Sequence, residues 1–329
     1  MKFRAVRIFE ENGEFVKKIV ERGIEDLPEG DVIIKVKYSS LNYKDALSCI
    51  GNRGVTRNYP HTPGIDAAGV VTECRTSDFK PGDEVILTGF DLGMNTDGGF
   101  GEYIRVPGEW VIKRPENLSL KEAMIYGTAG FTAGLSVYEL IKDVKPEDGK
   151  ILVSGGTGGV GSHAVRFLSK MGYQVTAVIN SDQEKELAMK LGADDIVNRD
   201  LLDDKSGKAL LKQSWAGVVD TVGGNPLSTA IRSLNYAGVV TTCGNVAGGE
   251  LPSATVYPFI LRGVKLVGID SVQCPKEKRE KIWSLISRDW KGSDLESGIK
   301  EVGIDGIFDE VENMLNGRLI GRVIIAHKG

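Results

Sequence analysis

Cysteine is scarce in this chain, and its few thiols lie far apart. The 329 residues include four of them, none in C-x-x-C spacing: Cys49, Cys74, Cys243 and Cys274. A disulfide framework or a zinc knuckle is therefore not expected. Histidine is equally scarce. Because the three histidines have no metal-ligand spacing, we expect each of them to be structural or solvated: His61, His163 and His327.

The chain also lacks a charge excess and any long apolar run. It carries 41 lysines and arginines against 45 aspartates and glutamates, a formal net charge of −4, without a basic tail. Nucleic acid and membrane surfaces are therefore not expected as main partners. No apolar stretch approaches the roughly 18 residues of a membrane span, and residues 1–6 resemble a strand rather than a signal peptide. These absences favour a cytoplasmic protein.

Glycine is abundant, with 42 residues, and one glycine cluster directly follows a buried strand. Residues 151–153 are Ile-Leu-Val, and a G-x-G-x-x-G turn follows with Gly156, Gly158 and Gly161. From Val160 onward apolar residues recur at helical spacing. A strand, a glycine turn and a helix in this order let backbone amides bind the pyrophosphate of a dinucleotide. The alternative is a strand–turn–helix without a ligand, which this order disfavours.

Two patterns of secondary structure divide the chain. Up to about residue 120, short runs rich in β-branched residues alternate with turn signals, which predicts a β-rich domain. A helical segment at 121–141 then leads into strands that alternate with crossover helices, expected at 151–154, 174–179, 194–197, 217–222, 238–243 and 264–269. This alternation predicts an α/β fold with a Rossmann-type doubly wound parallel sheet. We expect residues 123–271 to form this dinucleotide-binding domain, and residues 1–122 and 272–329 to form the β-rich catalytic domain.

Motifs along the whole chain resemble those of the medium-chain dehydrogenases/reductases. They include LNYKD at 41–45, PGIDAAG at 63–69, KPGDEV at 80–85 and GTAGFTA at 127–133. More narrowly, SSLNYKDAL at 39–47, PFILR at 258–262 and GIDSV at 268–272 are similar to the acryloyl-CoA reductase group, also called YhdH/YhfP-type quinone oxidoreductases. The resemblance implies a GroES-like catalytic domain, a Rossmann coenzyme domain and NADPH-dependent reduction of an activated carbon–carbon double bond.

The resemblance also indicates that the metal ligands of zinc-dependent relatives are missing. Those relatives have a Cys at the position of Asn42, a His at the position of Ile65 and a four-cysteine lobe within residues 89–101. This chain has no thiol in that region. Asn and Ile cannot supply the deprotonated ligands that zinc needs. We therefore expect no metal and no alcohol oxidation through Lewis-acid polarisation.

Without a metal, the cofactor is expected to deliver hydride while the protein gives electrostatic help. Hydride addition to an enone or enoyl thioester leaves negative charge on the carbonyl oxygen, which needs a donor, and then a proton at the α-carbon. By resemblance, Tyr43 and Asn42 lie in the loop that carries the first metal ligand of zinc relatives. We expect Tyr43 to donate and Asn42 to orient substrate or nicotinamide; alternatively both only shape the cleft and water supplies the proton. By resemblance, Asp66 takes the place of an acid near the active site of zinc relatives; we expect Asp66 and Asp45 to cap backbone amides, with a role in the active site as the alternative.

The choice of coenzyme depends on the end of the second strand of the parallel sheet. NAD-binding proteins usually place an acid there to hold the ribose diol, whereas this chain has neutral Asn180 and Ser181. These leave room for a 2′-phosphate, which Lys185 and Arg199 would neutralise, although Asp182 would repel it. The prediction is NADPH, with NADH as the alternative.

Further coenzyme contacts are expected in three places. The glycine turn is one, and the carboxyl ends of the fourth and fifth strands are another. By resemblance, the start of the long helix lies near the nicotinamide, where Thr128 is expected to contact the coenzyme, to act as an N-cap, or to do both. The expected residues are Thr128, Thr132, Gly156, Thr157, Gly158, Gly159, Val160, Gly161, Val222, Gly223, Cys243, Gly244 and Asn245.

These features predict a zinc-independent reductase whose partner is a small unsaturated acceptor such as an acyl-CoA thioester or an enone, with acryloyl-CoA as the family's best-defined substrate. A quinone reductase is the second hypothesis, and a non-catalytic dinucleotide-binding redox sensor is the third. Relatives pair the edge strand at 264–269 across a two-fold axis, so the resemblance also implies a homodimer.

Overall fold

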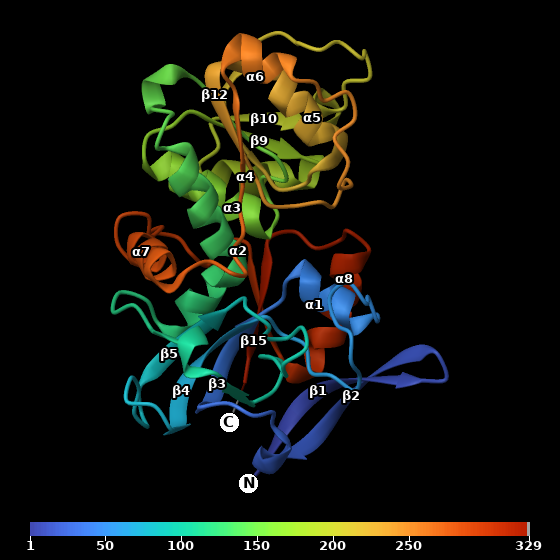
Figure 1. The fold of residues 1–329 in the computed structure, drawn as a ribbon, viewed down its shortest axis with the longest axis vertical. Coiled ribbons are helices and arrows are strands. Elements are labelled where there is room, and N and C mark those ends of the chain that lie inside the picture. The colour runs from blue at the N-terminus through green and yellow to red at the C-terminus, as the bar shows by residue number, and fades with distance from the viewer. Residues whose placement is uncertain (328–329) are drawn as a thin grey trace. The chain divides into compact units, whose positions relative to one another are not determined.

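The computed structural model describes residues 1–327 and divides the chain into two compact units. The first unit comprises Met1–Thr128, Val272–Pro275 and the chain from Gly298 onward. The second comprises Ala129–Ser271 and Lys276–Ser297. Each unit is described separately below (Figure 1).

The first unit is built on β-structure. Strands β1 (Lys2–Glu11) and β2 (Glu14–Gly23) form an antiparallel pair. A seven-stranded sheet has the order β14-β15-β3-β4-β5-β7, with β6 paired to β3. Its strands are β3 (Val32–Ser40), β4 (Asp66–Cys74), β5 (Glu84–Thr88), β6 (Tyr103–Val106), β7 (Ile112–Lys113), β14 (Ile299–Gly303) and β15 (Arg322–Ala326).

Alternation along β3 supplies the centre of the first unit's core. Successive side chains of a strand point to opposite faces, and the alternate residues Val32, Ile34 and Val36 are buried together with Leu87 and Ile104 from neighbouring strands. Helices α1 (Tyr43–Cys49) and α8 (Ile307–Leu315) pack against each other in this unit. Short 3₁₀ turns complete it at Ile24–Asp26, Gly108–Trp110 and Ile304–Gly306.

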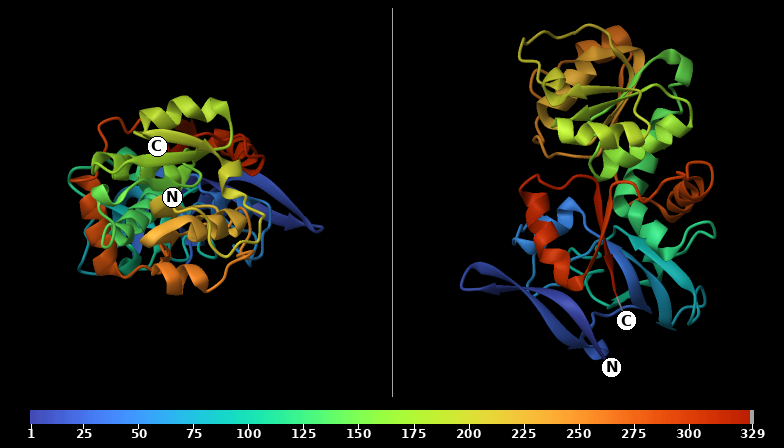
Figure 2. Two further views of the ribbon diagram at one scale, coloured as in Figure 1. Left: turned by 90° about the horizontal axis from the view of Figure 1, so that it is seen from above. Right: turned by 180° about the vertical axis from the view of Figure 1, so that it is seen from behind.

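The second unit contains six parallel strands in the order β10-β9-β8-β11-β12-β13. They are β8 (Ile151–Val153), β9 (Val175–Ile179), β10 (Asp195–Asn198), β11 (Trp215–Asp220), β12 (Leu234–Thr242) and β13 (Lys265–Gly268). Every residue of β8, β9 and β11 is buried, as expected where helices cover both faces of a parallel sheet (Figure 2). The predicted α/β class and doubly wound sheet are confirmed.

The helices of this unit follow the strands in alternation. They are α3 (Gly159–Lys170), α4 (Lys185–Lys190), α5 (Gly224–Ser233), α6 (Tyr257–Arg262) and α7 (Lys276–Ser287), with short 3₁₀ turns at Pro146–Asp148, Asp182–Glu184 and Arg199–Leu202. Helix α2 (Leu120–Leu140) begins in the first unit and ends in the second. Within residues 1–327, no helix combines the length and the apolar character needed to cross a membrane.

The segment around α7 differs from the expected division. All residues from 272 onward were expected in the β-rich domain, but Lys276–Ser297 belongs to the second unit. The reason is its packing on α2. The fully buried ring of Trp283 stacks on Phe131, with 6.1 Å between ring centroids, and the Arg279 guanidinium lies over the same Phe131 ring at 4.7 Å. The expected boundary at residue 122 likewise moves to Thr128 within α2.

Candidate active site and coenzyme site

Helix α2 is broken at Gly127, a feature that the sequence did not predict. Gly127 has φ 51° and ψ −154°, so two helical segments meet there. A Cβ at this glycine would lie 2.5 Å from Asp66 Oδ2 and from Arg322 Nη2, and 2.6 Å from Ser40 Oγ. Both the positive φ and this close approach require glycine. The break frees the backbone N–H of Thr128 for a new partner.

The carboxylate of Asp66 binds the amide at this break. The Thr128 N–H donates to both Asp66 oxygens at 2.9 and 3.0 Å, and the Thr128 hydroxyl donates to Oδ1 at 2.5 Å. Asp66 therefore has the capping role that we expected, and its negative charge lies at the start of the second helical segment, where the helix dipole favours it. Thr128 was expected to contact the coenzyme, to act as an N-cap, or to do both; its hydroxyl is bonded to Asp66.

Arg322, which the sequence analysis missed, lies beside Asp66 at the start of β15. Its buried guanidinium donates to Ser40 Oγ at 2.7 Å, to the Ile125 carbonyl at 2.7 Å and to Asn42 Oδ1 at 3.3 Å. It forms an ion pair with Asp66 Oδ2 at 3.4 Å. Burial lowers the pKa of Arg322, whereas the Asp66 charge opposes that shift. We refer to Ser40, Asn42, Asp66, Thr128 and Arg322 as the Asp66 network.

The two predicted catalytic residues differ in their surroundings. Both ends of the Asn42 amide are engaged, because Nδ2 donates to Asp66 Oδ2 at 2.8 Å and Oδ1 accepts from Arg322. Tyr43, the first residue of α1, has a 43% exposed side chain, and its hydroxyl has no hydrogen-bond partner among residues 1–327. The Tyr43 hydroxyl is thus not committed to the Asp66 network. Asn42 is better described as a residue that holds the Asp66 network together.

The residues at the metal position of zinc relatives do not fit a zinc ion. Asn42 is committed to its two partners, Ile65 is a buried apolar side chain, and the Arg322 guanidinium brings a positive charge to the same place. Zinc requires thiolate, imidazole or carboxylate ligands in tetrahedral array. Within the described part of the chain, no three His, Cys, Asp or Glu side chains are grouped to hold a metal ion. The four cysteines are free, and the three histidines are buried.

Asp45 is a second buried carboxyl next to the Asp66 network. It accepts the backbone N–H groups of Asn42 at 2.8 Å, Gly64 at 3.1 Å and Ile65 at 2.8 Å, so it caps backbone amides as expected. Burial, and to a lesser extent the charge of Asp66, raises the pKa of Asp45 from 3.8 to about 7. Near neutral pH this carboxyl is therefore close to half protonated.

The raised pKa of Asp45 predicts how stability depends on pH. Between about pH 4 and pH 7 the folded protein holds a proton on Asp45 that the unfolded chain has released. Stability therefore falls as the pH rises through this window, by at most about 1.4 kcal/mol per pH unit from this group. We expect the free energy of unfolding of the wild type to fall relative to Asp45→Asn between pH 4 and 7, measured by urea denaturation. A constant difference between the two proteins would contradict the assignment.

The glycine turn of the second unit has the close backbone packing that a phosphate cradle needs. A Cβ at Gly161 would lie 2.1 Å from the Gly155 carbonyl oxygen, and one at Gly156 would lie 2.7 Å from the Ala177 Cβ. Helix α3 begins at Gly159, with Gly158 as its N-cap. Its first amides therefore face the turn at the helix N-terminus, where anions bind. The arrangement fits the pyrophosphate of a dinucleotide, and it contains the predicted run Gly156, Thr157, Gly158, Gly159, Val160 and Gly161.

Asp220, at the carboxyl end of β11, ties three strand ends together. It accepts from the hydroxyls of Ser154 at 3.1 Å and Thr242 at 2.8 Å, and from the Gly223 N–H at 3.0 Å. Burial raises the pKa of Asp220, against the effect of these donors. The turn at Val222 and Gly223 is thereby held at the carboxyl ends of the strands, where ligands of open parallel sheets bind.

An open hollow of about 660 Å³ lies at the carboxyl ends of β12 and β13. It is lined by three of the predicted residues, Cys243, Gly244 and Asn245, together with Thr242, Gly268, Ile269 and Asp270. Burial raises the pKa of the Cys243 thiol to about 12, so this cysteine is not a thiolate nucleophile. The hollow has room for part of a coenzyme.

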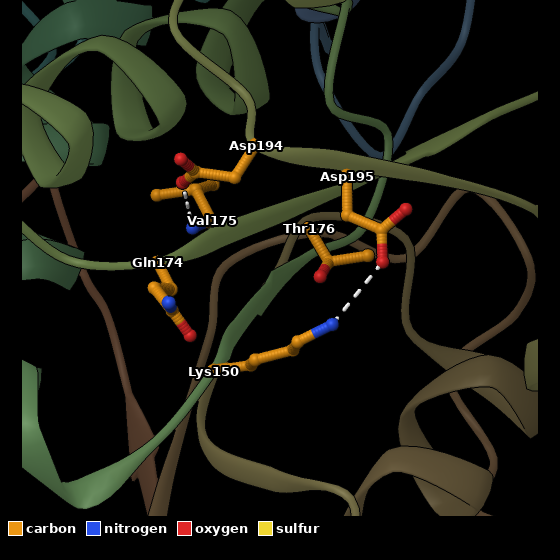
Figure 3. A pocket seen from close by; sticks show the side chains of 6 residues that line it. All are labelled: Lys150, Gln174, Val175, Thr176, Asp194 and Asp195. Carbon is orange, nitrogen blue, oxygen red and sulfur yellow. Dashed lines mark hydrogen bonds and ion pairs between the residues drawn. The ribbon is translucent and has the colours of Figure 1, made fainter.

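A smaller cavity of about 240 Å³ lies at the other ends of the parallel strands, where β8, β9 and β10 begin (Figure 3). It is lined by Lys150, Gln174, Val175, Thr176, Asp194 and Asp195, and the Lys150 ammonium pairs with Asp195 at 3.3 Å. None of the predicted site residues is among them. Ligands of doubly wound sheets bind at the carboxyl ends of the strands, so the coenzyme is not expected here.

The remaining predicted residues lie around the ends of β9 and β10. Asn180 and Ser181 follow β9 directly, and Arg199 follows β10, whose Asn198 pairs with Ile179 of β9. Lys185 and Arg199 are exposed. Thr132 is buried one helical turn beyond Thr128, in the second unit. A buried acid that the sequence analysis missed, Glu184, is the last residue of the 3₁₀ turn that follows β9.

Two family models match the chain. The model described as alcohol dehydrogenase GroES-like domain matches residues 28–116, and that described as zinc-binding dehydrogenase matches residues 159–288. The putative quinone oxidoreductase YhfP of Bacillus subtilis is 47% identical over 92% of both chains. This chain belongs to the medium-chain dehydrogenases/reductases. The probable acrylyl-CoA reductase AcuI of Escherichia coli is 41% identical to this chain, and the match covers 98% of this chain and 99% of AcuI.

Solved structures match this medium-chain dehydrogenase/reductase over nearly its whole length. The YhdH oxidoreductase of Salmonella enterica, solved in complex with NADP, has a TM-score of 0.96 and 39% identity and covers all of both chains. Bacillus subtilis YhfP, solved with NAD bound, has a TM-score of 0.96 and 44% identity over 99% of both chains. The predicted family and the GroES-like and Rossmann-type parts are thus confirmed, and the similar structures include one with each coenzyme.

Proposed function

We propose that this protein is a zinc-independent, NADPH-dependent reductase of a small molecule with an activated carbon–carbon double bond, such as acryloyl-CoA. The observation that carries the proposal is the Asp66 network, in which Asn42 and Arg322 are bonded at the position that holds zinc in other members of the family. The glycine turn before α3 supports the coenzyme assignment. The name of the E. coli relative, probable acrylyl-CoA reductase, supports the substrate class.

The chemistry requires one hydride and one proton. The reduced nicotinamide, when bound, supplies the hydride, which goes to the β-carbon of the substrate. The double bond then becomes single, the carbonyl oxygen gains negative charge, and a proton is needed at the α-carbon. Tyr43 is our candidate for the donor, because its hydroxyl is exposed and unpartnered among the described residues. Asn42 supports Tyr43 by fixing the start of α1.

Tyr43→Phe tests the donor role. If the Tyr43 hydroxyl stabilises or protonates the transition state, its removal should lower kcat by roughly 100-fold or more with little change in coenzyme affinity. The matched control is Tyr236→Phe, since Tyr236 is 76% exposed and lies in the second unit. Steady-state kinetics with NADPH and acryloyl-CoA give the comparison. An unchanged kcat would leave water as the proton donor.

An acceptor screen separates the proposal from its alternatives. The name of the B. subtilis relative, putative quinone oxidoreductase, supports a quinone as the second candidate acceptor. The protein is mixed with NADPH and either acryloyl-CoA or a soluble quinone, and the absorbance of the reduced nicotinamide is followed. Faster oxidation with acryloyl-CoA supports the double-bond reductase, and faster oxidation with the quinone supports the alternative. Tight NADPH binding without turnover of either acceptor would indicate a redox sensor.

We also propose a homodimer formed through β13. This strand is the last of its sheet, and an edge strand presents unpaired backbone groups. Large apolar side chains are exposed on and beside it: Tyr236, Tyr257, Ile260, Leu261 and Leu266. Two copies related by a two-fold axis would cover both features.

A charge placed on this surface should separate the copies. Light scattering after size exclusion should give twice the 35.6 kDa chain mass for the wild type and the single mass for Ile260→Glu. Ile260 is 68% exposed beside the edge strand, so a glutamate there costs little in the monomer. Ile50→Glu, at a 45% exposed position in the first unit, should remain dimeric. A monomeric wild type would refute the proposal.

A further inference from the structure

A buried carboxylate, Glu184, lies between the glycine turn and the end of β9. One oxygen, Oε2, accepts from the Thr157 hydroxyl within the glycine turn. The other, Oε1, accepts from the Asn180 N–H and the Ser181 hydroxyl, each at 3.3 Å. The side chain thus joins two segments that the sequence analysis assigned to different parts of the coenzyme. Only 6% of Glu184 is exposed.

Glu184 lies in the region where the adenosine ribose of a dinucleotide is expected in a doubly wound sheet. In a doubly wound sheet the pyrophosphate lies at the N-terminus of the helix after the first strand, and the ribose lies next to the end of the second strand. Thr157 belongs to the first of these places, and Asn180 and Ser181 belong to the second. Glu184 touches all three residues, so its carboxylate lies where the 2′ position of the ribose is expected.

The surroundings of Glu184 do not neutralise its charge. All three of its partners are neutral donors, and no Lys or Arg forms an ion pair with it among residues 1–327. A buried carboxylate without a cation is costly, and its two oxygens have room for more donors than these. The two hydroxyls of an unmodified ribose are donors of the required kind. A 2′-phosphate, by contrast, would bring a like charge to the carboxylate.

We propose that Glu184 is the specificity-determining residue at the 2′ position of the coenzyme. It accepts a hydrogen bond from the free 2′-hydroxyl of NADH, and it weakens the binding of the 2′-phosphate of NADPH that Lys185 and Arg199 favour. The protein therefore uses NADH as well as NADPH. The inference rests on the proposed dinucleotide function, and it replaces the expectation that the neutral Asn180 and Ser181 decide the coenzyme.

Coenzyme titrations of Glu184→Gln test this role. The amide keeps the size of the side chain and an acceptor oxygen but removes the charge. We expect the ratio of the Kd for NADPH to the Kd for NADH to fall by roughly tenfold or more. The matched control is Glu186→Gln, two residues away, because the Glu186 side chain is 81% exposed and pairs with Lys190 at 2.9 Å. Its ratio should equal that of the wild type. An unchanged ratio in Glu184→Gln would overturn the proposal.

A second measurement uses the wild type and does not depend on how any variant folds. NADH whose adenosine ribose lacks the 2′-hydroxyl should bind roughly tenfold more weakly than NADH, because its hydrogen bond to the charged Glu184 carboxylate is lost. Equal affinities would overturn the proposal. Both experiments follow nicotinamide fluorescence on binding and need no acceptor. If the protein showed no reductase activity, both binding experiments would still test the role of Glu184. If it bound neither coenzyme, the reductase proposal and the Glu184 proposal would both be wrong.

Discussion

Gly161→Ala is expected to weaken NADPH binding by roughly 100-fold, because one lost hydrogen bond from a backbone amide to a charged phosphate costs about 1.5–3 kcal/mol. The added Cβ would lie 2.1 Å from the Gly155 carbonyl oxygen, 2.8 Å from the Gly155 carbonyl carbon and 3.1 Å from the Gly156 Cα. These are backbone atoms, which cannot rotate away as a side chain would. The start of α3 must therefore move away from the glycine turn, and its free amides move with it.

The control for this substitution is Gly303→Ala at the end of β14. A Cβ there meets no atom within 4 Å, and the backbone φ of −82° suits any residue. Fluorescence titration should give Gly303→Ala the coenzyme affinity of the wild type, while circular dichroism checks that both variants are folded. If Gly161→Ala is folded and binds NADPH as tightly as the wild type, the glycine turn is not the phosphate site.

Arg322→Met is expected to lower the free energy of unfolding by about 3–5 kcal/mol, the range found when one partner of a buried ion pair is removed. The guanidinium is fully enclosed and bonds Ser40, Asn42, Asp66 and the Ile125 carbonyl. Without it the Asp66 carboxylate keeps its neutral donors but loses the only cation paired with it in the described chain. Urea denaturation measures the loss.

Two further variants show whether the loss comes from the charge of Asp66. The double variant Asp66→Asn/Arg322→Met should lose less free energy of unfolding than the sum of the losses of the two single variants. The difference, which measures the coupling of the two residues, should be about 0.5–3 kcal/mol. Arg318→Met is the matched control, because Arg318 is exposed and pairs with exposed Glu312 at 3.4 Å. It should change stability by less than about 0.5 kcal/mol. Additive losses at Asp66 and Arg322 would contradict the network.

The parallel sheet was predictable because its signals are local. The apolar run at 151–153, the glycine turn and the alternation of strands with crossover helices each lie within a few residues of one another. The helix break at Gly127 was not predictable in this way. It depends on Ser40, Asp66 and Arg322, which lie far along the chain in both directions. A glycine inside a helical pattern does not by itself indicate a break.

The candidate site was predictable in part for the same reason. Asn42 and Tyr43 were identified by motif, but only the bonds of Asn42 to Asp66 and Arg322 distinguish its supporting role from the free hydroxyl of Tyr43. Arg322 belongs to none of the motifs in the sequence, and its role depends on contacts with Ser40, Asn42 and Asp66, far away along the chain. Glu184 lies in a charged stretch of sequence that does not indicate burial, and only its bonds from Thr157 and Ser181 show its place in the structure.

The most direct test of the account is one rate, measured before and after treatment with a metal chelator. Protein, NADPH and acryloyl-CoA are mixed, the loss of reduced nicotinamide is followed, and the acyl-CoA product is identified by mass. We predict one saturated thioester per NADPH oxidised, at a rate that the chelator leaves unchanged. A rate that disappears with the chelator and returns on addition of zinc would contradict the claim that Asn42, Asp66 and Arg322 replace the metal.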